Sequence, residues 1–413
     1  MKHILRPLVC AMGLVSVSAM AATTITVAAF PDLDRSVKIA IQGYKKIKPD
    51  VEIKLVSLAY GDHHTAQTTA LATGANLPDV MAIDMGFIGK FAESGGLEDL
   101  SKAPYNGLQY QKQISKFSFP QAMAGTGALA AIPCDIGPGT MFYRKDIMDK
   151  AGVKEADLTK SWESYIAAGK KVKAATGAYM IPHANEIMAI AIRSGIKDGD
   201  GLYFDKKGEP AVDSPRFVKA FEHAKAARAA GIDGKIGAWS NEWSEGFKRG
   251  QLATEMMGAW LGGHLKNWIA PETKGLWRSA QLPGGSWASY GGSFYGIPKK
   301  ATHKAEAWDF IKYLTMDKGQ QIEAFRNVEA FPSLIAAQND DFLNQPIEFL
   351  GGQKARQLWK TAADHIVSTD VDKYDSTAQD IVNAELDKVL EQGKDIKSAL
   401  ADAKAQIKRR VRR

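Results

Sequence analysis

Two hydrophobic patterns alternate along the first hundred residues. Short runs of β-branched and apolar residues predict strands, and longer stretches in which apolar residues recur every three to four positions predict amphipathic helices. The expected strands are 24–30, 51–56 and 78–84, and the expected helices are 36–47, 63–73 and 87–94. Strands separated by helices favour a parallel sheet, so the sequence predicts an α/β fold.

Ligands of parallel α/β sheets bind beyond the carboxyl ends of the strands. The loops after the three expected strands, 30–34, 58–64 and 84–87, are therefore expected to border a binding site. They contain several polar and aromatic side chains that could contact a solute, namely Asp32, Tyr60, Asp62, His63, His64 and Asp84.

The N-terminus has the features of a secretion signal. Lys2 and Arg6 precede a short apolar run at 8–17, which is followed by Ala19-Met20-Ala21. This arrangement predicts cleavage after Ala21 and export to the periplasm. The apolar run is shorter than the ~20 residues that a membrane-spanning helix needs. Removing residues 1–21 from the 413 leaves 392, which is enough for two domains.

Charge does not indicate a nucleic-acid partner. The chain has 53 basic and 46 acidic residues, but Lys2 and Arg6 lie in the expected leader and five basic residues lie in 408–413. The rest of the chain is neutral, whereas a nucleic-acid groove needs a continuous basic surface. The basic C-terminus is either a solvated helix end or a contact for an anionic surface.

Cys134 is the one cysteine outside the leader, so no internal disulfide is expected. It lies in the strand-like run 131–135, where a buried structural thiol is the expected role. The adjacent His63 and His64 point to opposite sides of a helix, and no second pair of ligands is evident, so no metal or other cofactor is expected.

A glycine-rich run at 291–302 leads into an expected helix at 304–315. Further segments lie at 69–80, 95–100, 132–135, 141–146, 162–163 and 247–260. In their order and spacing they resemble the extracellular solute-binding protein family 1, the maltose-binding-protein-like sugar-binding proteins of bacterial ABC importers. Arg144 stands where an Asn is usual in this family. The resemblance covers most of 24–331.

The resemblance implies a two-lobed periplasmic binding protein fold. Each lobe would hold a mainly parallel sheet flanked by helices, with about three crossovers between the lobes. The N-terminal lobe would comprise 22–132 and 292–330, and the C-terminal lobe 133–291 and 331–413. Gly291 and Gly292 would lie in one crossover, where they form either a hinge or a plain turn.

A sugar site needs carboxylates and amides for hydroxyl groups, and aromatic rings for the apolar faces of the sugar. In the first lobe, Asp32 and Asp84 are expected either in the cleft or as helix caps, and one of the histidines, with His63 the chosen candidate, could bond a hydroxyl. Asp135 lies in the first crossover, or else takes part in the turn at 137–139. Gly292 and Ser293 are expected to border the solute.

The resemblance also points to residues of the second lobe. The loop that holds Asn185 and Glu186 faces the cleft in this family, although both residues could instead begin a helix. Trp260 stands where the family has a stacking aromatic residue, and a core tryptophan is the alternative. Tyr374 could reach the site from the C-terminal part of the chain.

The sequence thus predicts a protein that captures a sugar, a di- or oligosaccharide or a glycoside, and delivers it to an ABC permease. The chain has no phosphate-binding loop, so a separate subunit would use the ATP. A monomer is expected, with no catalytic residues. A secreted glycoside hydrolase or lyase remains an alternative, because paired carboxylates such as Asp84 and Asp135 also serve acid–base hydrolysis. A binding protein for a polyol, a sugar acid or a phosphodiester is a further alternative.

Overall fold

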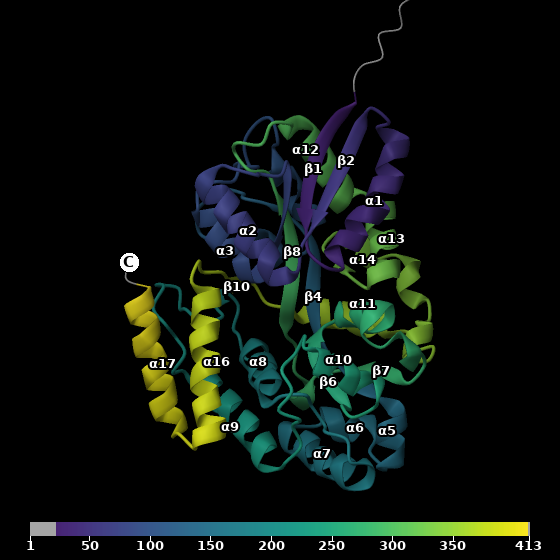
Figure 1. Cartoon of the computed structure of the whole chain (residues 1–413), viewed down its shortest axis with the longest axis vertical. Coiled ribbons are helices and arrows are strands. Elements are labelled where there is room, and N and C mark those ends of the chain that lie inside the picture. The colour runs from purple at the N-terminus through teal and green to yellow at the C-terminus, as the bar shows by residue number, and fades with distance from the viewer. Residues whose placement is uncertain (1–21, 412–413) are drawn as a thin grey trace, which may run out of the picture.

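The computed structural model describes residues 22–411 and arranges them in two lobes stacked along the long axis (Figure 1). The first lobe contains β1 (Thr23–Ala29), β2 (Val51–Ser57) and β3 (Val80–Asp84). The second lobe contains β6 (Thr254–Gly258) and β7 (Trp277–Ala280). Both lobes combine strands with surrounding helices, which confirms the α/β, two-lobed prediction. The leader and its cleavage site after Ala21 lie outside the described residues.

Helices cover both lobes. Those of the first lobe are α1 (Leu33–Ile47), α2 (Tyr60–Thr73), α3 (Met85–Glu93), α4 (Ser118–Gln121), α12 (Lys304–Met316) and α13 (Lys318–Val328). The other helices are α5 (Lys145–Lys150), α6 (Glu155–Thr159), α7 (Trp162–Thr176), α8 (Ala184–Ser194), α9 (Pro215–Ala229), α10 (Asn241–Lys248), α11 (Leu261–His264), α14 (Ile335–Gln338), α15 (Ala355–His365), α16 (Asp375–Gln392) and α17 (Ile396–Arg410). Short 3₁₀ and π turns join several of them, and two-residue strands β5 (Asp200–Gly201) and β10 (Thr369–Asp370) form a separate pair.

The first three strand–helix units follow the predicted order closely. Each helix nevertheless begins two or three residues earlier than expected, because at most three residues separate its start from the end of the preceding strand. The sequence pattern places the polar residues of these first turns in loops, because apolar residues do not recur there every three to four positions. Helix α2 ends at Gly74, whose φ of 75° is the left-handed conformation that glycine favours.

Two strands connect the lobes, β4 (Ile132–Arg144) and β8 (Ser289–Gly296). The sheet order is β2-β1-β3-β8-β4-β6, with β7 and the short β9 (Phe331–Pro332) also paired to β4. In Figure 1, β4 and β8 run through the middle of the molecule, between the two groups of helices. The beginning of β4 pairs with β8 and β9, and its end pairs with β6 and β7.

The mainly parallel sheet is confirmed only in the first lobe. There β1 pairs in parallel with β2 and β3. In the second lobe β4 is antiparallel to both β6 and β7, whereas the bridges Tyr179–Leu252 and Ile181–Asp233 are parallel, so this sheet is mixed rather than mainly parallel. The reason is that β4 enters this lobe from the first one, and its neighbours run in the opposite direction.

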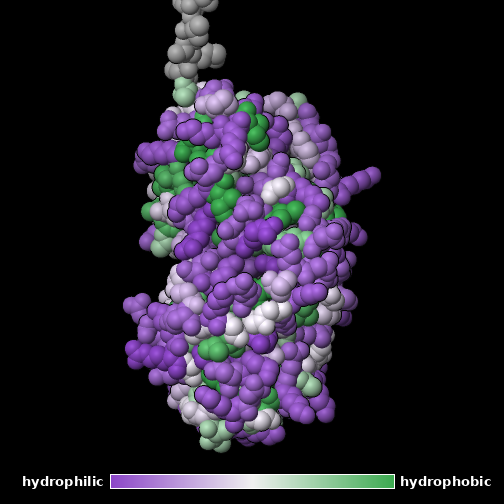
Figure 2. All heavy atoms as spheres, turned by 90° about the vertical axis from the view of Figure 1, so that its right-hand side faces the viewer, coloured by the Kyte–Doolittle hydropathy of each residue, from purple (hydrophilic) through white to green (hydrophobic). Residues whose placement is uncertain are grey.

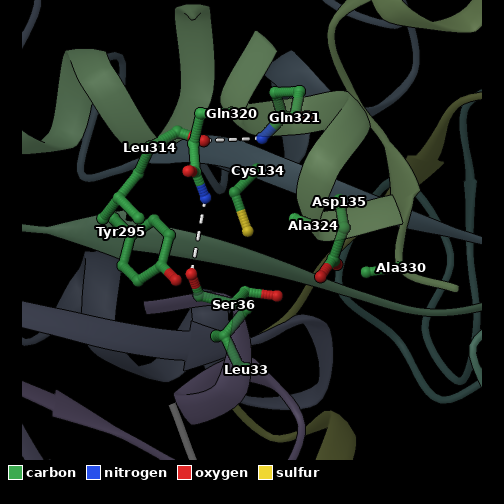
Figure 3. A pocket seen from close by; sticks show the side chains of 10 residues that line it. All are labelled: Leu33, Ser36, Cys134, Asp135, Tyr295, Leu314, Gln320, Gln321, Ala324 and Ala330. Carbon is green, nitrogen blue, oxygen red and sulfur yellow. Dashed lines mark hydrogen bonds between the residues drawn. The ribbon is translucent and has the colours of Figure 1, made fainter. Parts of the chain in front are cut away.

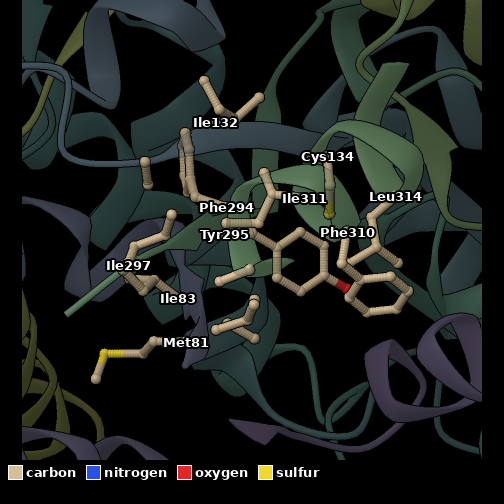
Figure 4. Packing of buried hydrophobic residues seen from close by; sticks show 14 of the residues in the cluster. Met81, Ile83, Ile132, Cys134, Phe294, Tyr295, Ile297, Phe310, Ile311 and Leu314 are labelled. Carbon is tan, nitrogen blue, oxygen red and sulfur yellow. The ribbon is translucent and has the colours of Figure 1, made fainter. Parts of the chain in front are cut away.

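Each lobe has its own apolar core. In the first lobe, side chains of β3 and β8 pack against α12, as shown for Met81, Phe294, Tyr295 and Phe310 (Figure 4). Cys134 belongs to this core as a free, buried thiol, as predicted. Burial raises the pKa of Cys134 well above its usual value, so the thiol is a poor nucleophile. The second lobe has three buried clusters, with large aromatic side chains such as Trp243, Trp277 and Trp359.

The C-terminal helices α16 and α17 pack against α9 in the second lobe. Near the end of α17, Lys404 and Lys408 form ion pairs with Asp213 and Glu209, each at 2.9 Å. Part of the basic C-terminus is therefore neutralised within the lobe. In the part of the chain that the structure covers, residues 22–411, there is no helix of the length and hydropathy needed to span a bilayer.

The lobes also touch away from the two connecting strands, where α3 meets the segment before α16. A Cβ atom on Gly89 would lie 2.8 Å from the carbonyl group of Asp372, so only glycine allows this approach. Beside it, Glu93 and Lys373 form an ion pair at 2.9 Å. Seen after a turn of 90° from the view of Figure 1, the surface is mostly hydrophilic, and its outline is indented at mid-height on one side (Figure 2).

Candidate functional site

Three polar residues lie in one row across neighbouring strands where the lobes meet. Ser293 of β8 is paired with Asp84 of β3 on one side and with Asp135 of β4 on the other. Directly opposed residues of an antiparallel pair have their side chains on the same face of the sheet. We call Asp84, Ser293 and Asp135 the carboxylate row.

Asp84 has two roles at the end of β3. Its Oδ1 accepts hydrogen bonds from the backbone N–H of Gly86 and from the hydroxyl of Tyr60, both at 2.8 Å. The first bond caps α3, and the second leaves Tyr60 beside the carboxylate with 46% of its surface exposed. Burial raises the pKa of Asp84, although these hydrogen bonds and the charge of Arg193 oppose the shift. The two predicted alternatives, helix cap and site residue, are therefore compatible.

Asp135 sits between the lobes, at a bulge of β4. Burial raises its pKa to about 7, hydrogen bonds from Ser293 lower it, and the nearby Asp84 raises it further. A carboxyl group with this pKa is present in both protonation states near neutral pH. It can therefore donate or accept a hydrogen bond.

Arg193, at the end of α8, is the cation around which the ionisable groups of both lobes gather. Its guanidinium lies 4.3 Å from the ring centre of Tyr290, and Nη1 donates to the carbonyl of Ala189 at 2.8 Å. Its charge lowers the pKa of Asp84 in the first lobe and of Glu186 and Asp375 in the second. One arginine thus faces three carboxyl groups.

The carboxyl groups of the second lobe are strongly desolvated. Glu186 is 5% exposed, and burial raises its pKa well above the usual value, with a further contribution from Glu255. Burial likewise raises the pKa of Glu255, which accepts from the indole N–H of Trp243, and that of Asp375, each to about 7. Such shifts gather at functional sites more often than elsewhere.

Trp260 is held against the connecting strands by glycine positions. Its indole N–H donates to the carbonyl of Tyr290 at 2.7 Å. A Cβ atom on Gly258 or Gly291 would lie only 2.2 Å or 2.8 Å from its Nε1 atom, and Gly291 also has a φ of 89°. The ring is partly exposed, so neither predicted alternative, platform or core, describes it completely.

Two further tryptophans extend from Trp260. Trp239 lies nearly parallel to Trp260 at 6.0 Å and to Trp268 at 6.4 Å between ring centres. Trp239 and Trp268 are 50% and 39% exposed, and Trp239 has a φ of 68°, an uncommon conformation for a bulky residue. His264 contacts all three rings edge-on. We call these four residues the indole group.

His264 also joins the indole group to the first lobe. Its Nδ1 atom lies 3.0 Å from Oδ2 of Asp32 and 3.1 Å from the indole nitrogen of Trp268. One ring nitrogen cannot donate to the carboxylate and accept from the indole N–H at the same time. Asp32 precedes α1 with a φ of 66°, and its side chain does not cap the helix. Its carboxylate instead meets His264 of the second lobe.

His63 does not belong to the site, and its prediction is corrected. Because α2 begins at Tyr60, His63 points into the lobe, where it is fully buried and bonded through Nε2 to the carbonyl of Ala82 at 2.8 Å. Burial lowers its pKa to about 4. His64 is also buried, and it stacks on Phe87.

The other predicted residues lie at the edge of this region. In α8, the N-cap is His183 rather than Asn185, and the amide oxygen of Asn185 is buried with no hydrogen-bond partner within residues 22–411. Gly292, with a φ of 135°, lies in β8 between Gly291, which approaches Trp260, and Ser293. Tyr374 precedes α16 and is partly buried beside the ion-paired Lys373.

Sequence reasoning missed Arg193, Tyr290, Asp375, His264, Trp239 and Trp268. Arg193 follows the apolar face of α8 and resembles an ordinary last-turn cation. The one usable signal was composition, since four tryptophans and a histidine lie within residues 239–268. Among residues 22–411, no three His, Cys, Asp or Glu side chains are grouped so that they could hold a metal ion.

Comparison with known proteins shows the family to which the chain belongs. The family model of the bacterial extracellular solute-binding proteins matches residues 30–321. A lactose-binding protein of Rhizobium radiobacter is 27% identical over 358 residues, covering 82% of this chain and 80% of its own. An arabinooligosaccharide-binding protein of Bacillus subtilis (strain 168) is 27% identical over 289 residues, covering 66% and 64%.

Solved structures show the same fold. A binding protein associated with an ABC transporter of B. animalis subsp. lactis, in complex with β-1,6-galactobiose, has a TM-score of 0.77 and 23% identity, covering 94% of this chain and 97% of its own. The maltose-bound MalE3 of T. maritima has a TM-score of 0.77 and 20% identity, covering 94% and 100%. With the family model matched over residues 30–321, the chain belongs to the bacterial extracellular solute-binding proteins.

Proposed function

We propose that this protein captures a carbohydrate between its lobes and delivers it to the permease of an ABC importer, without catalysing a reaction. The observation that carries the proposal is the pairing of a carboxylate row on one lobe with an indole group on the other. Carboxylates bond sugar hydroxyls, and indoles cover the apolar faces of the ring. The printed names of the relatives, which include lactose- and arabinooligosaccharide-binding proteins, support a di- or oligosaccharide or a glycoside.

The strand pairing supports the lobe boundaries that we propose. We assign 22–132 with 292–330 to the N-terminal lobe and 133–291 with 331–413 to the C-terminal lobe. Asp135 pairs with both Ser293 and Pro332, so the three proposed crossovers lie side by side. A narrow set of adjacent crossovers lets two lobes rotate as rigid bodies around a solute.

The first lobe contributes Asp32, Tyr60, Asp84, Gly292 and Ser293 to the proposed site, with Asp135 at the crossover. The contact of Asp32 with His264 and the effect of the Arg193 charge on the pKa of Asp84 support this proposal. The second lobe contributes Arg193, Tyr290 and the indole group, together with the predicted residues Asn185, Glu186, Trp260 and Tyr374. His63 is left out because it has no accessible surface.

Location and partners follow from the family. We propose that the chain is exported, cleaved after Ala21, and acts as a periplasmic monomer. Binding stabilises the closed arrangement in proportion to the difference in affinity between the open and closed forms. The membrane subunits then recognise this arrangement, and a separate ATPase supplies the energy.

One observation favours an alternative, a secreted glycoside hydrolase or lyase. The pKa of Asp135, raised by burial to about 7, suits a general acid, and Asp84 is a second carboxylate in the same row. Anionic solutes such as sugar acids or phosphodiesters fit less well, because Arg193 faces three carboxyl groups. A neutral polyol fits the same chemistry as a sugar.

Thermal-shift screening of the mature protein, residues 22–413, tests the proposal directly. A solute that binds the native state raises the melting temperature in a concentration-dependent way. The panel should contain monosaccharides, lactose, galactobiose, maltose and arabino-oligosaccharides, with matched polyols and sugar acids. Each hit is then incubated with the protein and its products are separated. A shift without turnover supports capture, whereas release of smaller sugars would establish the hydrolase.

A further inference from the structure

A small cavity lies beside the carboxylate row, on the first-lobe side of the connecting strands (Figure 3). Cys134 and Asp135 of β4 and Tyr295 of β8 line one side, and α1 and α13 line the other. Ser293 and Tyr295 are two residues apart on β8, so their side chains share one face of the sheet. The cavity is therefore the inward continuation of the row that holds Asp84 and Asp135.

Polar groups without protein partners surround this cavity. The hydroxyls of Ser36 and Tyr295 and the amide oxygen of Gln321 are buried, and none has a hydrogen-bond partner in the described chain, residues 22–411. Ser36 is 6% exposed and Tyr295 only 1%. These groups come from α1, β8 and α13, so they are not explained by one local turn.

The neighbouring amides show that this polarity is built in. The side-chain N–H of Gln321 donates to the carbonyl of Leu314 at 2.6 Å, and this bond fixes the amide. The side-chain N–H of Gln320 donates to the carbonyl of Ser36 at 3.4 Å (Figure 3). Each glutamine thus uses one side-chain N–H within the protein.

The size of the cavity matches a water molecule. It leaves about 20 Å³ of space for the centres of water molecules. Roughly 10–15 Å³, measured in the same way, is enough for one water, provided that the site offers two to four polar partners. A buried hydroxyl without any partner is unfavourable, so several of them around a space of this size indicate a hydrated site.

We propose that ordered water occupies this cavity as a permanent part of the hinge, hydrogen-bonded to the hydroxyls of Ser36 and Tyr295 and to the amide oxygen of Gln321. The water joins α1 and α13 of the first lobe to β4 and β8 at their crossover. Water is favoured over a metal cation, because Asp135 is the one carboxyl group among the lining residues, and the others are hydroxyls, amides, a thiol and apolar side chains.

The sign of a stability change tests the proposal. Tyr295→Phe removes one hydroxyl and keeps the ring. If the hydroxyl bonds to water, the variant loses that bond and its melting temperature falls, by about 1–3 °C for a protein of this size. If the cavity is dry, the variant loses an unpaired buried hydroxyl and its melting temperature rises. A rise would overturn the proposal.

A matched variant calibrates this measurement. The hydroxyl of Tyr165 is buried and paired with Oγ1 of Thr254 at 2.7 Å, so Tyr165→Phe must lower the melting temperature. Should Tyr295→Phe fail to fold, the wild-type protein still decides the question. A crystal structure at high resolution should show water density within hydrogen-bond distance of Ser36 and Tyr295, and an empty cavity there would refute the proposal.

The identity of the occupant is tested with salts. The melting temperature of the wild-type protein should be the same in sodium, potassium and choline chloride at equal ionic strength. A higher value in sodium or potassium that disappears in Tyr295→Phe would show a cation site and overturn the assignment of water.

Discussion

The carboxylate row and the indole group face the same junction between the lobes, but different forces hold them in place. The row is set by strand register, because Ser293 is paired with Asp84 and Asp135 through the backbone. The indole group is set by packing, with Trp239 in a left-handed backbone conformation and two rings well exposed. The carboxyl groups of the carboxylate row are buried, so a change of pH should alter mainly their charge. Two rings of the indole group are exposed, so a solute should contact mainly this group.

The largest expected effect is the pH dependence caused by Asp135. Its pKa is about 7 in the folded chain and close to 3.9 when unfolded, so the folded state binds more protons between these values. The contribution of Asp135 to the free energy of unfolding is therefore highest below pH 4 and falls as the pH rises to 7. Asp135→Asn should remove about 4 kcal/mol of that decline. Urea denaturation at several pH values measures it.

Asp99 provides a control of opposite sign. Burial raises its pKa, but hydrogen bonds from Ser101 and Lys102 outweigh burial, and the net shift is downward. Asp99→Asn should therefore remove a part of the stability that is present at neutral pH and lost as the pH falls. If Asp135→Asn and wild type show the same pH profile between 4 and 7, the row is not desolvated as described.

The second effect concerns the platform. Trp260→Ala should weaken binding of the solute found by thermal-shift screening by about 2–4 kcal/mol, roughly 30- to 1000-fold, because it removes a central aromatic contact. Titration calorimetry measures the change. Trp287→Ala is the control, since this partly exposed indole stacks on His365 outside the site. Equal affinities of Trp260→Ala and Trp287→Ala would exclude Trp260 as a platform.

A somewhat smaller effect is expected for Asp84→Asn. Asparagine can still cap α3, so the change removes mainly the charge that would accept sugar hydroxyls. Affinity should fall by about 1.5–3 kcal/mol, or 10- to 150-fold. Asp317→Asn is a matched control, because Asp317 caps α13 through a 2.8 Å bond to the N–H of Gln320. A loss of similar size in both variants would point to a general effect on the lobe.

The smallest effect belongs to the link between the two regions. His264→Gln removes the 3.0 Å contact with Asp32, in which both side chains are largely buried, and one such hydrogen bond is worth about 0.5–1 kcal/mol. Because this contact exists only when the lobes meet, solute dissociation should be about 2- to 5-fold faster in stopped-flow measurements. His365→Gln should leave it unchanged. An unaltered rate in both variants would show that the contact does not hold the lobes together.

The sequence predicted those parts of the molecule that depend on local pattern. Strands β1 to β3, their helices and Asp84 followed from hydrophobic period and from the rule for strand ends. The carboxylate row did not, because it requires the register of β8, more than 200 residues after β3. His63 was misplaced because the expected start of α2 was three residues too late. The side of the helix on which His63 lies was therefore predicted incorrectly. Arg193 and Asp375 meet through packing of α8 and α16, for which no local signal exists.

Strand β4 has a mechanical consequence. It is thirteen residues long, and the sheets of both lobes include it, so neither lobe can lose its sheet without exposing part of the other. Pulling the chain apart from its ends should therefore load both halves through one shared backbone segment. We expect the two halves to yield together as a single mechanical unit, although each has a core of its own.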